Sequence, residues 1–349
     1  MRKKREKKKK DKKGGEREEG AKEEKMRTVI EAIGVIICVL IGVAFLTLAE
    51  RKVLASMHIR KGPNEAGVFG ILQPIADGVK LFSKETIIPT LSNVGLFITA
   101  PILSLALAML SWAVIPFEEG VVISDISIGI LWIFAVSSIS VYAVLISGWA
   151  SNSKYAFFGA IRAAAQMISY EVAMGIIIIT VIVCAGELNL TKIVESQKDI
   201  WYFIPLWPAF FMFYVSALAE TARVPFDLPE GESELVSGYN VEYSAMTFAM
   251  FFLAEYTHII FMSVFTVILF FGGWQPILNV APLNWIPGLI WLSIKTLGVI
   301  YVFIWVRGSL PRMRYDQLMG LLWKTYLPVS LGLVVVTASI IIWTNGLII

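Results

Sequence analysis

Six carboxylates and one arginine gather in the stretch 220–242, which reads ETARVPFDLPEGESELVSGYNVE. The acidic members are Glu220, Asp227, Glu230, Glu232, Glu234 and Glu242, and the base is Arg223. Long apolar runs flank the stretch on both sides. A dense group of carboxylates between membrane spans is costly unless it is solvated, paired or partly protonated. The stretch is therefore either a solvated loop or a site that exchanges protons.

Three glutamates lie inside apolar runs or at their edges: Glu171, Glu220 and Glu255. Buried carboxylates that lie near one another can take up and release protons close to neutral pH. His258 follows Glu255 by three residues, which places both side chains on one helix face. These residue types and positions predict a proton relay, with a structural buried pair or hydrogen bond as the alternative.

Several kinds of chemistry have no matching motif in the sequence. There is no GxGxxG before a helix, no GxxxxGK[ST], no HExxH and no CxxC. Cys38 and Cys184 both lie in apolar runs and offer neither a disulfide framework nor metal-ligand spacing. Because His58 lies outside every expected span, facing haem ligands are not expected either. We expect no bound metal or nucleotide, and a substrate that is lipid-soluble or is a proton.

The composition predicts an all-α polytopic membrane protein. Hydrophobic residues make up 57% of the chain and charged residues 16%, whereas soluble domains carry about 25% charged residues. Apolar runs near the length of a membrane span occur eight times, and the alternating segments of a membrane barrel are absent. The eight expected transmembrane helices are 28–49, 94–115, 126–150, 168–186, 201–219, 245–271, 288–306 and 326–343.

Loop charge orients these spans. The loops after spans one, three, five and seven carry 13 Lys and Arg residues, and the remaining loops with the C-terminal end carry 2. Positively charged loops stay on the cytoplasmic or matrix side, so the first set is expected there and both termini on the opposite side.

Residues 1–27 form a basic head with 14 Lys or Arg and 7 Asp or Glu. Almost nothing in this segment is apolar, so we expect it to be disordered. Met26 opens an ordinary start before the first span, which suggests that the head is not native to the mature chain. Residues 28–349 are then expected to form a single membrane domain.

The first inside loop predicts an amphipathic surface helix over 70–85. Its apolar residues recur at helical spacing, and its charged residues take another face. The apolar face is Leu72, Ile75, Val79 and Phe82, and the charged residues are Asp77, Lys80 and Lys84. Simple packing at the bilayer surface is the alternative to a role in function.

Five segments together closely resemble one family, the quinone-site membrane subunit of respiratory complex I (NADH dehydrogenase subunit 1, also NADH-ubiquinone oxidoreductase chain 1). The segments are ERKVLASMHIRKGPNEAGVFGILQPIADGVKLFSKE, GWASNSKYAFFGAIRAAAQMISYEV, LAETARVPFDLPEGESELVSGYNVEY, FFLAEY and RYDQLMGLLWK. The resemblance covers nearly everything from residue 28 onward. Its mitochondrial and alphaproteobacterial branch fits best, which implies the mitochondrial inner membrane, with a bacterial plasma membrane as the alternative.

The resemblance implies eight spans plus a surface helix, as the residue patterns do. It also implies a role in forming, with two peripheral subunits, the chamber where ubiquinone is reduced. Iron–sulfur clusters and flavin would reside only in partner subunits, and ubiquinone would be the substrate. Other expected partners are small membrane subunits and lipid, but not nucleic acid. The isolated chain is expected to have no redox activity.

The resemblance also implies roles for individual residues. Glu171 in SYEV, Glu220 in LAET and Glu255 in AEY match carboxylates that lead from the chamber into the membrane. Asp227, Glu230, Glu232, Glu234 and Glu242 match the acidic loop of the family. Positions near the chamber or its entrance are matched by Glu50, Arg51, Arg60, Asp77, Arg162, Arg223 and Arg307.

Three positions depart from the resemblance. The family often has Gln at the position of His58 and Asn at the positions of Ala222 and His258. His258 would add a titrating group, and Ala222 would remove an amide near Arg223. Other classes remain open: a membrane subunit of a related hydrogenase, a secondary transporter, and a pure membrane anchor. The intact motifs disfavour the first, the absence of internal repeats the second, and the buried carboxylates the third.

Overall fold

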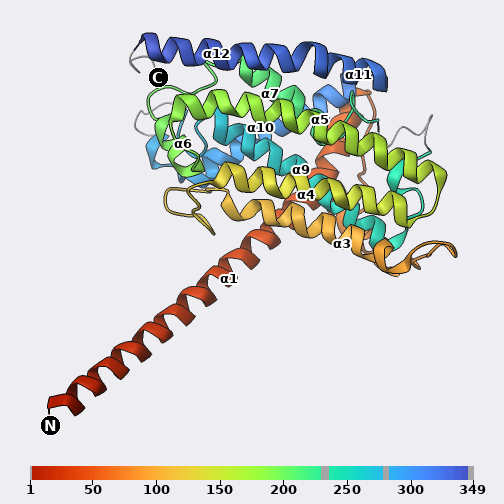
Figure 1. Cartoon of the computed structure of the whole chain (residues 1–349). Helices are drawn as coiled ribbons and strands as arrows, with labels where there is room; N and C mark the ends of the chain where they lie inside the picture. Colours follow the sequence, from red (N-terminus) through yellow and green to blue (C-terminus); the bar gives the residue numbers. More distant parts are fainter. Residues whose placement is uncertain (1, 229–235, 278–282, 345–349) are drawn as a thin grey trace.

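The computed structural model describes residues 2–228, 236–277 and 283–344, and its long elements are all helices (Figure 1). These long helices are α1 (Arg2–Met57), α3 (Val94–Leu110), α4 (Gly129–Ala150), α5 (Lys154–Ala185), α7 (Trp207–Glu220), α9 (Ala245–Phe270), α10 (Gly288–Ser309) and α12 (Leu327–Trp343). Within those ranges, β structure is limited to one isolated bridge between Glu118 and Val121. The predicted all-α class is confirmed.

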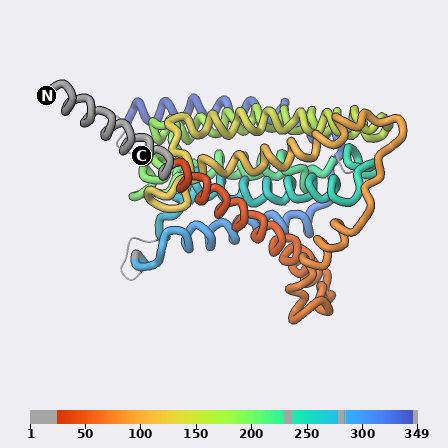
Figure 2. The backbone as a smooth tube through the Cα atoms, turned by 90° about the horizontal axis from the view of Figure 1, so that it is seen from below, coloured from red at the N-terminus to blue at the C-terminus, as the bar shows by residue number. Residues whose placement is uncertain are grey.

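Short helices fill the connections. They are η1 (Val68–Gly70), α2 (Gln73–Ser83), η2 (Ser111–Val114), α6 (Leu190–Ser196), η3 (Gly238–Asn240), η4 (Leu283–Trp285), α11 (Tyr315–Leu321) and the π-helix η5 (Leu322–Tyr326). The α2 helix confirms the amphipathic surface helix expected over 70–85, and its apolar residues Ile75, Val79 and Phe82 are exposed. Figure 2 shows that the segment with η1 and α2 stands out from one end of the bundle.

Seven helices in the described part are long and apolar enough to cross a membrane, which is one fewer than the sequence predicts. They are Lys25–Met57, Val94–Val114, Gly129–Ala150, Lys154–Ala185, Ala245–Phe270, Gly288–Ser309 and Tyr315–Trp343. The difference lies in the fifth expected span, 201–219, where only the 14-residue α7 forms. A helix of this length extends for about 21 Å, whereas a bilayer core is about 30 Å thick.

The shortening of α7 has a local cause. Pro208 occupies the first turn of the helix, a position that favours helix initiation. Ahead of it, residues 201–206 fold into turns: Tyr202 donates its N–H to the side chain of Gln197, and Phe203 donates to the carbonyl of Phe270. Non-helical backbone is tolerated at membrane depth where the protein itself satisfies it. Buried Tyr202 and Leu206 place this turn inside the bundle.

Small residues bring α5 close to its neighbours. A Cβ atom on Gly148 of α4 would overlap the Cβ of Ala160 on α5. A Cβ atom on Gly159 of α5 would lie 2.6 Å from the Cα of Gly238 in η3. Glycine at helix crossings lets the backbones approach closely. This packing places the middle of α5 directly beside α4, and the two helices run side by side in Figures 1 and 2.

Lys295, a charged residue inside an expected span, caps the end of α9. Its ammonium group donates to the carbonyls of Phe271 at 2.6 Å, Gly273 at 3.1 Å and Gln275 at 2.6 Å. It also lies 4.4 Å from the centre of the Trp201 ring. Three acceptors match the three donors of an ammonium group, so Lys295 is accounted for by structure.

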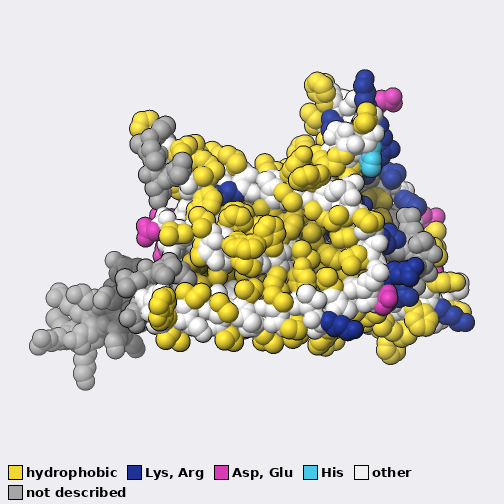
Figure 3. All heavy atoms as spheres, turned by 90° about the horizontal axis from the view of Figure 1, so that it is seen from above, with side chains coloured by type: hydrophobic (Ala, Val, Ile, Leu, Met, Phe, Trp, Pro, Cys, Tyr) yellow, Lys and Arg dark blue, Asp and Glu magenta, His cyan; other side chains and the backbone are white. Residues whose placement is uncertain are grey.

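The ends of the molecule differ in charge. Figure 3 shows Lys and Arg side chains gathered at one end of the bundle. This end carries the loop between α1 and α3 and the segment between α10 and α11, as the loop-charge pattern predicts. The helix α1 begins at Arg2 and so includes the basic head; the expected disorder of residues 1–27, and their status as a non-native segment, stay predictions.

Candidate functional site

The segment that follows α7 carries the first group of predicted site residues. The side-chain amide of Gln166 on α5 donates to the carbonyl of Ala219 at 2.6 Å and to that of Phe226 at 2.9 Å. Gln166 is fully buried, so these two bonds fix both ends of the turn that contains Arg223. Met313, just before α11, donates its N–H to the carbonyl of Pro225 at 3.0 Å. The turn is therefore held from two sides.

Arg223 is the centre of a buried ion-pair network. Its guanidinium lies 2.9 Å from Glu255 of α9 and 3.6 Å from Glu50 of α1. Glu50 is only 7% exposed, and it accepts hydrogen bonds from Arg307 of α10 and from the hydroxyl of Tyr256. Together, Glu50, Arg223, Glu255, Tyr256 and Arg307 form what we call the arginine network. Two carboxylates and two guanidinium groups balance in charge.

The surroundings of Arg223 keep it charged. Burial alone would lower the pKa of its guanidinium, but Glu255, with Tyr256 and Glu50, raises the pKa above its ordinary value. The guanidinium also lies 4.5 Å from the centre of the Tyr256 ring, a cation–π geometry. An 8% exposed arginine with two carboxylate partners is a permanent positive charge inside the bundle.

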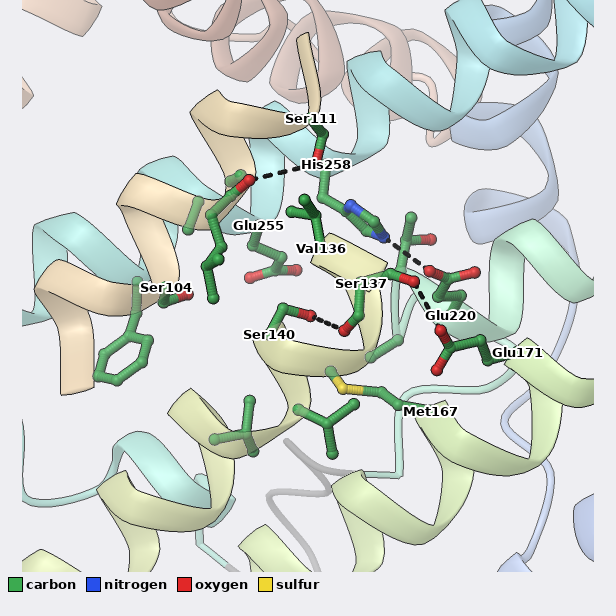
Figure 4. Close-up of a pocket in the computed structure, with 18 of the residues that line it drawn as sticks. Ser104, Ser111, Val136, Ser137, Ser140, Met167, Glu171, Glu220, Glu255 and His258 are labelled. Atoms are coloured by element: carbon green, nitrogen blue, oxygen red, sulfur yellow. Dashed lines mark hydrogen bonds and ion pairs between the residues drawn. The ribbon is translucent and has the colours of Figure 1, made fainter. Parts of the chain in front are cut away.

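A cavity of about 90 Å³ opens beside the arginine network. Its walls come from α3, η2, α4, α5, α9 and the end of α7, and we call it the serine-lined cavity. Its polar lining residues include Ser104, Ser111, Ser137, Ser140, Glu171, Glu220, Glu255 and His258 (Figure 4). All three glutamates predicted to form a relay therefore border one space.

Inside the cavity, Glu171 and Glu220 have partners of different kinds. The carboxylate of Glu171 accepts hydrogen bonds from Ser137 at 2.7 Å and Ser138 at 2.6 Å, both on α4. Oε1 of Glu220, the last residue of α7, lies 3.3 Å from Nε2 of His258 on α9. The other oxygen of Glu220 is buried and has no hydrogen-bond partner within the described residues. Figure 4 shows His258 pointing toward Glu220 rather than toward Glu255.

Glu255 belongs to both sites. Its carboxylate pairs with Arg223 in the arginine network, and its side chain also lines the serine-lined cavity. The two sites are therefore contiguous through one carboxylate, which can respond to charge on one side and exchange protons on the other.

Two further predicted pairs lie nearer the surface. Arg51 at the end of α1 binds Asp77 of α2 at 2.7 Å, and Gln73 donates to the same carboxylate at 3.2 Å. Asp227 binds Arg312 at 3.0 Å. These contacts tie the surface helix and the segment before α11 to the core of the bundle.

The structure does not join every predicted residue to these sites. Arg60 is exposed in the loop after α1, Arg162 lies on α5, and Glu242 is partly buried between η3 and α9. Glu230, Glu232 and Glu234 lie outside the described residues. Their expected place in an acidic loop stays a prediction.

Sequence reasoning did not single out the hydrogen-bond donors. Ser137 and Ser138, which hold Glu171, stand next to each other inside an otherwise apolar span, and this was the available signal. Tyr256 follows Glu255 directly in the chain. Gln166, a lone amide in the run AAAQM, could also have been noticed as a buried polar residue that needs partners.

Comparison with known proteins agrees with the architecture. The profile of the NADH dehydrogenase family matches residues 30–338. The NADH-ubiquinone oxidoreductase chain 1 of Metridium senile is 60% identical over 93% of this chain and 96% of its own length. A membrane subunit of the NADH-quinone oxidoreductase of Rhodospirillum rubrum is 59% identical over 90% and 94%. The NADH-ubiquinone oxidoreductase chain 1 of Arabidopsis thaliana is 55% identical over 89% and 96%. The chain belongs to the NADH dehydrogenase family.

Proposed function

We propose that this member of the NADH dehydrogenase family is a membrane subunit of respiratory complex I. In this proposal it forms part of the chamber where ubiquinone is reduced, and it passes the energy of that reduction to proton translocation. Its relatives are named as parts of NADH-ubiquinone and NADH-quinone oxidoreductases, which supports the assignment to the enzyme complex. Its membrane is the mitochondrial inner membrane or the bacterial plasma membrane.

The quinone chamber lies at the basic end of the bundle. Residues from the end of α1, from α2 and from the end of α10 face this end, and they include Arg51, Asp77 and Arg307. Arg60 and Arg162 belong to the same end by their place in the chain. Two peripheral subunits complete the chamber, and an iron–sulfur cluster in one of them supplies the electrons. This chain contributes the surface that holds the quinone.

Reduction of a quinone to a quinol takes up two electrons and two protons, so it changes the charge close to the chamber. The arginine network is the first buried structure that such a change reaches. Movement of Arg223 away from Glu255 removes the counter-charge of a buried carboxylate, and a buried carboxylate without a counter-charge takes up a proton. The acidic loop, with Asp227, Glu230, Glu232, Glu234 and Glu242, responds to the same change.

The serine-lined cavity continues the path. A polar cavity of about 90 Å³ accommodates several water molecules. Water and serine hydroxyls can carry a proton between Glu255, Glu220 and Glu171 without large movements of the helices. The observation that carries this proposal is the double membership of Glu255, which pairs with Arg223 and lines the cavity.

Replacement of Glu255 by Gln tests the proposal, because the amide keeps the shape of the carboxylate and loses its charge. In vesicles that contain the assembled complex, we expect NADH-to-dye reduction within about twofold of wild type and proton pumping at least about tenfold lower. Glu195→Gln, an exposed carboxylate on α6, is the matched control. A native gel stained for NADH activity checks assembly. Unchanged pumping in an assembled Glu255→Gln complex would remove Glu255 from the path.

A further inference from the structure

We propose that His258 is a proton-carrying member of the relay in this chain, and that it exchanges its proton with Glu220 inside the serine-lined cavity. The inference rests on the proposed function and adds to it a residue whose side chain the resembling family often replaces by Asn. It is carried by the position of the imidazole relative to Glu220, and not by its position three residues after Glu255.

The geometry places one ring nitrogen at the carboxylate. Nε2 of His258 lies 3.3 Å from Oε1 of Glu220, and the two residues come from different helices, α9 and α7. The ring lies nearly parallel to that of Phe261, with 6.1 Å between centroids and 16° between planes. The neighbouring aromatic ring orients the imidazole toward Glu220, and Figure 4 shows this orientation.

Glu220 has few other ways to compensate its charge. It is 7% exposed, and among the ion pairs of the described residues its one basic partner is His258. The second carboxylate oxygen is buried without a hydrogen bond in that part of the chain. A buried carboxylate in this situation either holds a proton or depends on the charge of its partner. The protonation states of His258 and Glu220 are therefore linked.

The exchange is a simple proton transfer. In one state the imidazolium of His258 faces the carboxylate of Glu220. In the other state the N–H bond at Nε2 has broken, an O–H bond has formed on Oε1, and both groups are neutral. No electrons enter or leave. Because imidazole has an ordinary pKa of about 6.5, it is the side chain that changes charge most readily between pH 5 and 8.

Other titratable groups also border the cavity and enter the same equilibrium. They are Glu171 from α5, Tyr239 from η3, Glu220 from α7 and Glu255 from α9 itself, whereas α3, η2 and α4 contribute serine hydroxyls. Every carboxylate among them can donate to or accept from water in the cavity. His258 differs from them because it is positively charged when it carries its proton.

A structural role is the alternative to be excluded, since a hydrogen bond from His258 would also hold the end of α7 against α9. His258→Asn separates the two roles. Asparagine can still donate a hydrogen bond to Glu220, but it cannot carry a proton. It is also the residue that the resembling family often has at this position, which favours normal folding. His258→Gln is a second variant with a longer reach.

The experiment uses the assembled complex in vesicles, with NADH-to-dye reduction, quinone reduction and proton pumping measured across the range from acidic to mildly basic pH. For both His258 variants we expect dye reduction within about twofold of wild type, and pumping at neutral pH about tenfold lower. We also expect the component of the wild-type pH profile that titrates near the histidine range to disappear. His58→Gln, which removes the exposed histidine of the first loop, should keep the wild-type profile.

Three outcomes are distinguishable when Glu220→Gln is measured alongside. Loss of pumping in Glu220→Gln, with a changed pH profile in His258→Asn, supports the inference. Loss of pumping in Glu220→Gln, with a wild-type profile in His258→Asn at any rate, assigns His258 to structure, overturns the inference and leaves the proposed function intact. Unchanged pumping in Glu220→Gln contradicts the proposed function itself.

Discussion

The arginine network and the serine-lined cavity both hold buried carboxylates, but they neutralise them in different ways. In the network, Glu50 and Glu255 face Arg223 and Arg307, so each negative charge has a permanent positive partner. In the cavity, Glu171 faces two serine hydroxyls and Glu220 faces one imidazole. Hydroxyls carry no charge, and imidazole carries one only when it is protonated.

This difference separates two tasks. Carboxylates matched by arginine stay ionised and hold helices together, because a guanidinium group does not lose its proton in proteins. Carboxylates matched by hydroxyls or imidazole can change their protonation without leaving a permanent charge unpaired. The network is therefore suited to sensing charge at the basic end of the bundle, and the cavity to moving protons.

Replacement of Arg223 by Met gives the largest expected effect on stability. It leaves Glu50 and Glu255 buried with less counter-charge, and breaking a buried ion pair from one side costs about 3–5 kcal/mol. The surface pair of Arg51 and Asp77 is the control, because Arg51 is 47% exposed and such pairs contribute about 0–1 kcal/mol. Thermal denaturation and native-gel assembly of Arg223→Met and Arg51→Met measure the difference. Equal losses in both variants would contradict the distinction between buried and exposed pairs.

Removal of the two serine donors of Glu171 tests the cavity with a smaller expected effect. Hydrogen bonds to a charged group contribute about 1.5–3 kcal/mol, so Ser137→Ala combined with Ser138→Ala alters the proton exchange of Glu171 more than it alters assembly. We expect a severalfold slower rate of proton pumping, with dye reduction retained. Ser339→Ala, an exposed hydroxyl on α12, is the matched control. A double variant that pumps like wild type would exclude Glu171 and its donors from the relay.

Much of the fold follows from the sequence, because a membrane span needs about twenty apolar residues and such runs are easily found. The apolar spacing of Ile75, Val79 and Phe82 predicted α2 for a similarly local reason. The fifth span was overestimated because composition does not reveal where a buried turn replaces a helix. Gln197 and the carbonyl of Phe270 satisfy the backbone of that turn, and Pro208 was the local signal that the helix begins later.

The site could be predicted as a set of residues but not as a set of partners. Glu171, Glu220 and Glu255 were identified because ionisable groups are costly at membrane depth. The pairing of Glu50 with Arg307, which are 257 positions apart, depends on how α1 packs against α10. His258 shares a helix face with Glu255, yet it pairs with Glu220 because the end of α7 reaches the cavity at that height.

The central claim is that a carboxylate without an arginine partner carries protons, and the most direct test is the number of protons translocated per NADH oxidised in Glu220→Gln complexes. The amide preserves the shape of the side chain and its ability to hydrogen bond with His258, but it cannot exchange a proton. We predict that NADH-to-dye reduction stays within about twofold of wild type while the proton-to-electron ratio falls at least about tenfold. An unchanged ratio in an assembled, NADH-active complex would contradict the assignment of the serine-lined cavity to proton transfer.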